Sequence, residues 1–198
     1  MRILVTGGAG FIGSTLTERL LALGHDVTCF DNFDAFYDPQ IKRRNLAAAA
    51  RSPRFCLADG DIGDASLLGR LLGERVDTIV HLAARAGVRP SIADPAAYER
   101  TNVQGTIALL EACRRHRVPH LVFGSSSSVY GISRDVPFNE ETSRLLPASP
   151  YGVTKLAGEY FCRAHEHLYG MPITCLRFFT VYGPRQRAPT WRFTASCV

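Results

Sequence analysis

Six short apolar segments alternate with helix-like segments along the whole chain. Strand-like runs cover residues 2–6, 26–31, 54–61, 77–84, 120–128 and 172–179, and apolar residues at helical spacing cover 11–24, 39–51, 65–74, 95–117 and 149–170. Continuous apolar strands separated by helices are typical of a parallel sheet that is covered on both faces. Because such crossovers are right-handed, the pattern predicts an α/β fold with a doubly wound parallel sheet.

Length and composition fit an ordinary globular domain. The 198 residues are 46% hydrophobic and 21% charged, which allows one domain, or one domain with a fragment of another. No apolar run reaches the length of a membrane span, and we expect neither a signal peptide nor a transmembrane helix. No cysteines form a CxxC pair, and buried, reduced thiols in a cytoplasmic protein are expected for Cys29, Cys56, Cys113, Cys162, Cys175 and Cys197.

The net charge of +5 comes almost wholly from arginine. Only Lys42 and Lys155 are lysines, which leaves 21 arginines among the 23 basic residues. Short basic clusters at 42–44 and 114–117 are interpreted as solvated helix faces. A modest positive excess suits a small anionic substrate, whereas no motif or aromatic-basic platform points to nucleic acid. The histidines are not spaced as metal ligands, so no metal site is predicted.

A glycine-rich turn, TGGAGFIG at 6–13, follows the first strand and opens the first helix. Gly7, Gly10 and Gly13 have the spacing that allows a tight turn, a close backbone approach to a pyrophosphate and close helix packing. The helix N-terminus offers free N–H groups and a positive dipole end to phosphate. Asp31 ends the second strand, where a carboxylate can bind a ribose 2′-hydroxyl and would repel a 2′-phosphate. The combination predicts NAD rather than NADP.

Tyr151 and Lys155 lie four residues apart near the start of a predicted helix, so they share one face. An ammonium beside a phenol lowers the pKa of the tyrosine, which makes it a usable base near neutral pH. The segment SSSSVYG at 125–131 follows the fifth strand, at the sheet edge where ligands bind in open parallel sheets. Serines there also cap turns, and such Tyr–Lys pairs also form surface contacts. Their combination with the glycine turn favours a catalytic site.

These motifs together resemble the extended short-chain dehydrogenase/reductase superfamily. Within it, the chain most resembles the NAD-dependent nucleotide-sugar epimerases and dehydratases, and among these the UDP-glucuronate 4-epimerases. The resemblance runs from residue 1 to residue 187 and rests on TGGAGFIG, DNFDAFYDP (31–39), GDI (60–62), HLAARAGVRPSI (81–92), TNVQGT (101–106), SSSSVYG, SPYGVTKLAGE and LRFFTVYGPRQR (176–187). It implies a Rossmann-like fold.

The resemblance also implies a role for each matching residue. Tyr151 would be the catalytic base, Lys155 would bind the nicotinamide ribose, and Ser126 would hydrogen-bond the reacting oxygen. NAD would be held by Gly7, Gly10, Phe11, Ile12, Gly13, Asp31, Asn32, Asp61, Ile62, Leu82, Ala83, Ala84, Asn102, Tyr151, Lys155 and Phe179. The nucleotide-sugar substrate would be contacted by Ser127, Ser128, Arg89, Thr180 and Arg185.

The implied reaction is an internal redox cycle at C4 of a UDP-sugar, from UDP-glucuronate to UDP-galacturonate. A hydride moves from C4 to NAD, and the 4-keto sugar turns over before the hydride returns. Dehydratases carry an acidic pair where this chain has Ser127 and Ser128, which argues against dehydration. UDP-glucose stays open as the substrate, because Arg89 and Arg185 could bind a carboxylate, a phosphate or a surface acid. Arg85 replaces a neutral polar residue of the family, and the sequence suggests no role for it.

The resemblance stops near Arg187. The family continues into a C-terminal substrate-binding region, which we expect to be missing here, so that residues 1–187 form the NAD-binding domain and 188–198 an aberrant tail. One back-translation of the tail, read two bases later, gives PDLAIHRFVR, which resembles the family's continuation and suggests a frameshift. The chain would then be an epimerase domain, an NAD-binding domain without turnover, or a fragment without function. A homodimer through the helices at 95–117 and 149–170 stays open.

Overall fold

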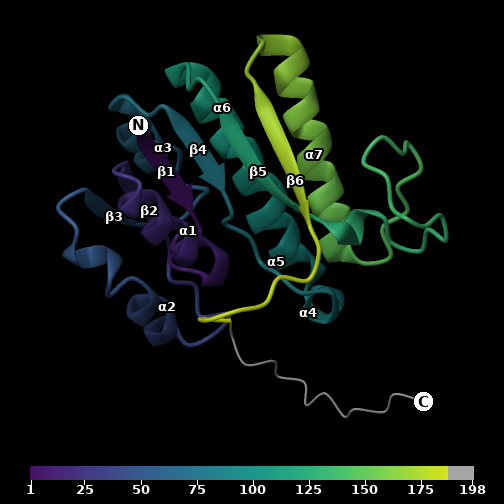
Figure 1. Ribbon diagram of the computed structural model, residues 1–198. Coiled ribbons are helices and arrows are strands. Elements are labelled where there is room, and N and C mark those ends of the chain that lie inside the picture. The colour runs from purple at the N-terminus through teal and green to yellow at the C-terminus, as the bar shows by residue number, and fades with distance from the viewer. Residues whose placement is uncertain (187–198) are drawn as a thin grey trace.

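A single parallel sheet organises the chain. The computed structural model describes residues 1–186 and arranges its six strands in the order β3–β2–β1–β4–β5–β6 (Figure 1). The strands are β1 (Arg2–Thr6), β2 (Asp26–Asp31), β3 (Phe55–Asp59), β4 (Thr78–His81), β5 (Leu121–Ser126) and β6 (Ile173–Phe178). The order reverses between β1 and β4, which places a crevice at their carboxyl ends. The predicted doubly wound α/β fold is confirmed, while the predicted tail at 188–198 lies outside the described residues.

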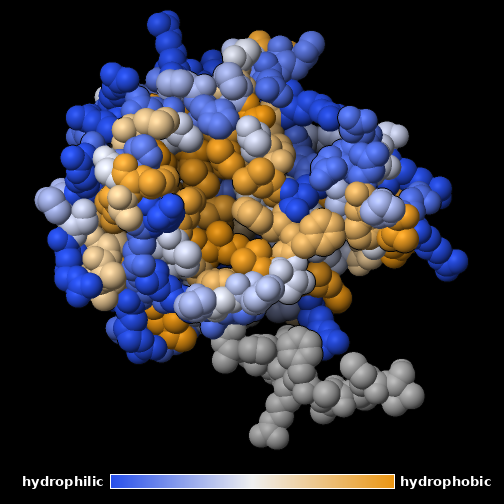
Figure 2. All heavy atoms as spheres, in the orientation of Figure 1, coloured by the Kyte–Doolittle hydropathy of each residue, from blue (hydrophilic) through white to orange (hydrophobic). Residues whose placement is uncertain are grey.

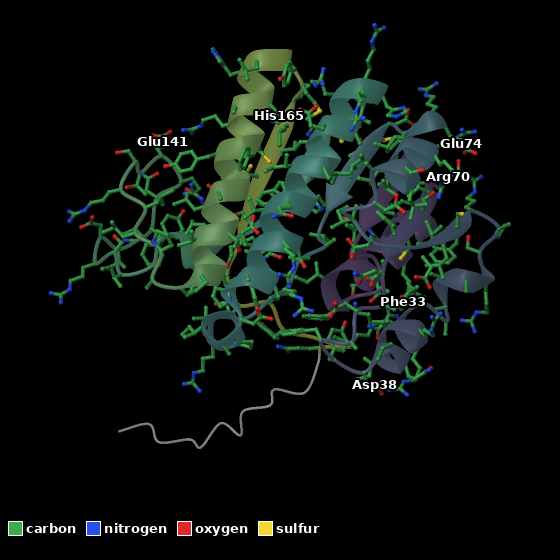
Figure 3. All side chains as sticks on the ribbon, turned by 180° about the vertical axis from the view of Figure 1, so that it is seen from behind. Phe33, Asp38, Arg70, Glu74, Glu141 and His165 are labelled. Carbon is green, nitrogen blue, oxygen red and sulfur yellow. The ribbon has the colours of Figure 1, made fainter. Side chains whose placement is uncertain are left out.

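Helices cover both faces of this sheet. They are α1 (Phe11–Ala22), α2 (Pro39–Asn45), α3 (Ala65–Gly73), α4 (Val88–Ala93), α5 (Pro95–Glu99), α6 (Gly105–His116) and α7 (Pro150–Tyr169). The helices α3, α6 and α7 pack on the face seen in Figure 3, and α1 packs on the opposite face. Side chains of a strand alternate between faces. Leu4 therefore belongs to the core under α3 and α6, while Ile3 and Val5 pack against α1.

The long helix expected at 95–117 is interrupted. A π-helical turn at Arg100–Gln104 separates α5 from α6. The turn carries Asn102, whose buried side chain accepts from the Arg85 N–H at 2.8 Å and donates to the Arg85 carbonyl at 3.0 Å. Single π turns often occur at functional sites, because they turn a side chain out of the helical register. The helix expected at 39–51 also ends early, as α2 and a 3₁₀ turn, and the short helix α4 was not expected.

The cysteines differ in burial according to the element that carries them. Five are described and all five are free thiols. Cys29, Cys113 and Cys162 are buried as expected, but the expectation is wrong for Cys56 and Cys175, which are exposed. The reason is that Cys56 lies on β3 and Cys175 on β6, the two edge strands, which have a neighbour on one side only. Among the described residues, no helix is long and apolar enough to cross a membrane.

Candidate active site

A continuous cleft lies at the carboxyl ends of β1, β4 and β5. It comprises a hollow of about 130 Å³ beside β2 and an adjoining hollow of about 500 Å³ that reaches β5 and α7. Figure 2 shows apolar side chains gathered on this side of the molecule. Six residues line both hollows, namely Gly7, Gly10, Phe36, Tyr37, Leu82 and Ala84. The cleft therefore runs across the crevice where open α/β sheets bind their ligands.

The glycine turn forms the floor of the cleft. Gly7 has a φ of +68°, and a Cβ there would lie 2.7 Å from the Ala83 backbone nitrogen, so the turn can pass β4 only as glycine. A Cβ on Gly13 would collide with the Gly7 carbonyl, which confirms close packing, although against the turn itself rather than against the sheet. No side chain caps Gly10 at the start of α1. Phe11 and Ile12 line the larger hollow, and the uncapped helix end beside them suits a pyrophosphate.

Asp31 sits at the end of β2 with its carboxylate almost fully buried. One oxygen accepts from the Phe33 N–H at 2.9 Å and from the Lys42 ammonium at 3.0 Å, and the other accepts from the Ala9 N–H at 3.2 Å. Asp31 and Lys42 both line the smaller hollow, where they present an acceptor and a donor that suit the hydroxyls of a ribose. The interpretation of Lys42 as part of a solvated helix face is wrong, because this residue is only 8% exposed.

Three further residues predicted to hold NAD, namely Asn32, Asp61 and Ile62, lie next to this pair. The Asn32 amide donates to Asp61 at 2.8 Å, and Asp61 also accepts from the Gly63 N–H at 2.8 Å. Asn32 and Ile62 line the smaller hollow, while Asp61 holds Asn32 in place from outside it. Leu82, Ala83 and Ala84, which follow β4, line the same hollow.

Tyr151, Lys155 and Ser126 meet at the far end of the larger hollow. The first two come from the first turns of α7, and Ser126 ends β5. The Lys155 ammonium is buried and donates to the Gly124 carbonyl at 2.7 Å. The helix begins where it does because the Ser149 hydroxyl caps it by accepting from the Gly152 N–H, and Pro150 supplies a suitable first residue.

The ionisation of this group departs from the prediction. Burial raises the pKa of the Tyr151 phenol, and a hydrogen bond with the Ser126 hydroxyl opposes that rise. Burial also lowers the pKa of Lys155 to about 8. The expectation that Lys155 lowers the Tyr151 pKa is therefore wrong for this structure, because the ammonium is directed to the Gly124 carbonyl and burial dominates at the phenol.

A buried polar network connects the glycine turn, β4 and α6. Thr106 donates its single hydroxyl proton to the Asn102 carbonyl at 2.6 Å, so His81 must donate its Nε2 proton to Thr106 at 3.0 Å. His81 Nδ1 is then the acceptor for the Thr6 hydroxyl at 2.7 Å. Burial, together with the Lys155 charge, lowers the pKa of His81 to about 3, so the ring stays neutral. Asn102 also donates to the Thr154 hydroxyl on α7, and thereby supports the cleft without lining it.

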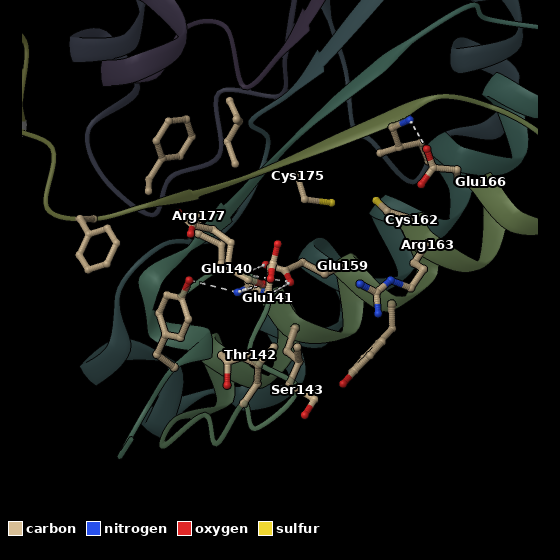
Figure 4. Close-up of a pocket in the computed structure, with 18 residues that line it drawn as sticks. Glu140, Glu141, Thr142, Ser143, Glu159, Cys162, Arg163, Glu166, Cys175 and Arg177 are labelled. Atoms are coloured by element: carbon tan, nitrogen blue, oxygen red, sulfur yellow. Dashed lines mark hydrogen bonds and ion pairs between the residues drawn. The ribbon is translucent and has the colours of Figure 1, made fainter. Parts of the chain in front are cut away.

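An ion pair behind the serine cluster was missed at the sequence level. Glu159 extends the helical stripe of Tyr151 and Lys155 by four residues, a spacing that could have revealed it. Its carboxylate accepts from the Ser125 hydroxyl and from Arg177, whose Nη2 lies 2.8 Å away. Arg177 also donates to the Tyr130 hydroxyl at 3.1 Å (Figure 4). This network joins the end of β5 to α7 and β6.

The network lines another hollow, which is separate from the two hollows of the cleft. It measures about 760 Å³ and lies between α7, β6 and the loop that carries Glu140 and Glu141 (Figure 4). Cys162 and Cys175 approach each other there, within hydrogen-bond reach. Of the residues predicted to bind substrate or cofactor, this hollow contains only Phe179, which also lines the cleft.

The predicted substrate residues are only partly brought together. The hydroxyl oxygens of Ser126 and Ser128 lie 3.1 Å apart, Ser127 lies beside them, and none of Ser127, Ser128 and Thr180 lines the cleft. Arg89 is exposed on α4. Arg185 does line the larger hollow of the cleft, but both Glu18 carboxylate oxygens lie 2.7 Å from its Nη2, and its Nη1 is buried without a partner. In the described part of the chain, no group of three or more acidic, histidine or cysteine residues could hold a metal ion.

Comparisons with known proteins agree with this geometry. The model of the NAD dependent epimerase/dehydratase family matches residues 3–195. UDP-glucuronate 4-epimerase 3 of Arabidopsis thaliana is 45% identical over 184 residues, which are 92% of this chain but 43% of that protein. The chain thus spans less than half the length of such curated relatives.

Two solved structures show the same similarity in three dimensions. UDP-glucuronic acid 4-epimerase from Bacillus cereus, in complex with UDP-glucuronic acid and NAD, has a TM-score of 0.89 and 41% identity, covering 94% of this chain and 59% of that one. UDP-glucose 4-epimerase from Thermus thermophilus, in complex with NAD, has a TM-score of 0.83 and 37% identity, covering 94% and 58%.

Proposed function

Because this chain belongs to the NAD dependent epimerase/dehydratase family, we propose that it carries the cofactor site and catalytic residues of an NAD-dependent 4-epimerase of UDP-sugars. The proposed reaction converts UDP-glucuronate to UDP-galacturonate through a 4-keto intermediate. The observation that carries the proposal is the meeting of Tyr151, buried Lys155 and Ser126 at one end of a cleft whose other end holds Asp31.

NAD, when bound, supplies a hydride acceptor that can return the hydride to the same carbon. The protein supplies binding and proton transfer. The start of α1 would hold the pyrophosphate, and Asp31 with Lys42 would hold the adenosine ribose. Lys155 would orient the nicotinamide ribose from its buried position.

Tyr151 would exchange a proton with the sugar 4-oxygen, and Ser126 would hydrogen-bond that oxygen. The raised pKa of the phenol keeps Tyr151 protonated at neutral pH, which suits the return of a proton to a keto oxygen. Removing the first proton requires a lower pKa, and the Ser126 hydroxyl is the group in this structure that acts in that direction. Ser127 and Ser128 carry no acid that could eliminate water, which favours epimerisation over dehydration.

The choice of sugar is the finer part of the proposal. UDP-glucuronate is favoured by the name of a curated relative that is 45% identical to this chain and by the solved structure with UDP-glucuronic acid. Arg89 and Arg185 are the candidate partners of the carboxylate, and Arg185 would first have to leave Glu18. UDP-glucose is the alternative, supported by the similarity to a UDP-glucose 4-epimerase.

A second candidate function is NAD binding without turnover. It is favoured by the exposure of the residues at the sugar end, where Phe179 is 57% exposed and Tyr182 is 85% exposed. Binding energy from the uridine part of the substrate would then be missing from the reaction. This candidate predicts normal affinity for NAD and no change of the sugar.

Incubation of the chain with UDP-glucuronate and NAD, followed by chromatography of the nucleotide sugars, tests these candidates. The first predicts UDP-galacturonate and at least a hundredfold slower conversion by Tyr151→Phe, which keeps the ring and removes the proton-transferring oxygen. Parallel incubation with UDP-glucose decides between the two sugars. NAD binding without product would support the second candidate, and no NAD binding would refute both.

Two further parts of the proposal concern location and assembly. We place the protein in the cytoplasm, which is supported by the five free thiols. A homodimer through α6 and α7 is supported by exposed apolar residues on α7, of which Val153 is 52% and Tyr160 54% exposed. Light scattering tests the assembly, and a monomer at micromolar concentration would refute it.

A further inference from the structure

The loop after β2 is folded by its own acidic and amide side chains. Asn32 accepts from the Asp34 N–H at 3.0 Å, Asp34 accepts from the Phe36 N–H at 2.7 Å, and Asp38 accepts from the Gln40 N–H at 2.9 Å. Such Asx turns hold a loop in one conformation with little help from the rest of the protein. The loop thereby holds Phe36 against the cleft (the flanking residues Phe33 and Asp38 are labelled in Figure 3).

Arg85 ties this loop to the segment after β4. Its Nη2 lies 3.0 Å and 3.3 Å from the two Asp34 carboxylate oxygens, and its guanidinium lies 5.6 Å from the centre of the Phe36 ring. The Arg85 backbone is held on both its N–H and its carbonyl by Asn102. Asn102 therefore holds the Arg85 backbone and Asp34 holds its guanidinium, while 27% of the side chain is exposed.

The joined segments line the smaller hollow and reach the point where the two hollows meet. Asp34 and Arg85 line the smaller hollow, while Phe36 lines both hollows and so stands where they meet. Phe36 packs edge-on against Tyr98 with ring centres 6.5 Å apart, and Tyr98 packs edge-on against Tyr151 at 6.3 Å. A ligand that fills both hollows would contact Phe36 where they meet, and Asp34 and Arg85 in the smaller one.

We propose that the Arg85–Asp34 ion pair is a clasp that retains NAD in the cleft. The proposal rests on the proposed function, which makes NAD the ligand of both hollows. An internal redox cycle needs such retention, because the hydride must return to the same sugar before the cofactor leaves. Arg85 and Asp34 act as positioning residues, since they hold Phe36 and the loop rather than touch the reacting atoms.

A double-mutant cycle on NAD binding tests the clasp. Arg85→Gln removes the charge, and Asp34→Asn removes the other charge while its amide oxygen can still accept from the Phe36 N–H. Binding is measured by NADH fluorescence and by displacement of NADH with NAD, so no turnover is needed. Each single variant should raise the dissociation constant and the dissociation rate about fivefold, the upper range for a partly exposed ion pair. The double variant should bind no worse than either single one.

Arg75→Gln is the matched control, because Arg75 forms an ion pair with Asp77 at the opposite end of β4. It should leave NAD binding unchanged. Equal affinity of Arg85→Gln and the wild type would overturn the clasp, as would additive losses in the cycle or a change confined to the association rate. In those outcomes the wild type still binds NAD and the proposed function stands. Failure of the wild type to bind NAD would overturn both proposals.

Discussion

Replacing Lys155 by methionine should stabilise the fold at neutral pH even though it removes a site residue. Lys155 is 5% exposed, and burial lowers its pKa from 10.5 to about 8. The folded protein therefore binds a proton at this position less readily than the unfolded chain does. Below about pH 8 both states are protonated, and the folded state carries the full cost of a buried ammonium.

The size of the effect follows from the shift. A difference between 10.5 and about 8 corresponds to about 3 kcal/mol, since one pKa unit is worth about 1.4 kcal/mol. Methionine also loses the hydrogen bond to the Gly124 carbonyl, at a cost of about 1 kcal/mol. Lys155→Met should thus raise the free energy of unfolding by about 2 kcal/mol at neutral pH.

The stability advantage of Lys155→Met over the wild type should shrink as the pH rises from about 8 to about 10.5. In this range only the unfolded wild type keeps the proton on Lys155, so the wild type gains stability. Near the upper limit the variant should be about 1 kcal/mol less stable than the wild type. Urea unfolding of both proteins over this range measures the difference, and other titrating groups cancel in it. A constant difference, or a variant that is less stable at neutral pH, would refute the reasoning.

Three other perturbations have defined outcomes. Burial lowers the His81 pKa to about 3, so between about pH 6.5 and pH 3 only the unfolded state takes up a proton at this position. Between pH 7 and pH 4.5 the free energy of unfolding, measured with urea, should therefore fall by about 3 kcal/mol more for the wild type than for His81→Asn; an equal fall in both proteins would contradict this. Glu159→Gln should lower the free energy of unfolding by about 3 kcal/mol, because Arg177, only 14% exposed at its side chain, keeps an uncompensated charge; a thermal midpoint equal to that of the wild type would exclude this. Iodoacetamide should modify Cys175 before Cys113, since Cys175 is exposed and a hydrogen bond from the Cys162 thiol lowers its pKa, whereas burial raises the Cys113 pKa to about 12; peptide mass spectrometry showing the reverse order would argue against it.

The parts of the fold that depend on local pattern were predictable. Apolar runs separated by helical spacing lead directly to the parallel sheet, and the glycine turn leads to the cleft because Gly7 must pass β4 without a Cβ. The Tyr151–Lys155 pair was found for the same reason, since a spacing of four in a helix places both side chains on one face.

The parts that depend on contacts between residues far apart in the sequence were not predictable. Lys42 looks like a surface residue until β2 and α2 bring it within 3.0 Å of Asp31. Arg85 acquires a role only because the loop after β2, about fifty residues earlier in the sequence, reaches its guanidinium. The pKa of Tyr151 could not be read from its neighbour in the helix, because burial and the direction of the Lys155 side chain are tertiary properties.

The internal redox cycle is tested most directly with UDP-glucuronate that carries deuterium at C4. After incubation of the chain with this substrate and NAD in ordinary water, the proposal predicts UDP-galacturonate that keeps the deuterium at C4, because the hydride leaves and returns without exchange. Mass spectrometry and proton NMR of the product measure the label. A C4 epimer with solvent hydrogen at that carbon, or NAD binding without any C4 epimer, would contradict the account.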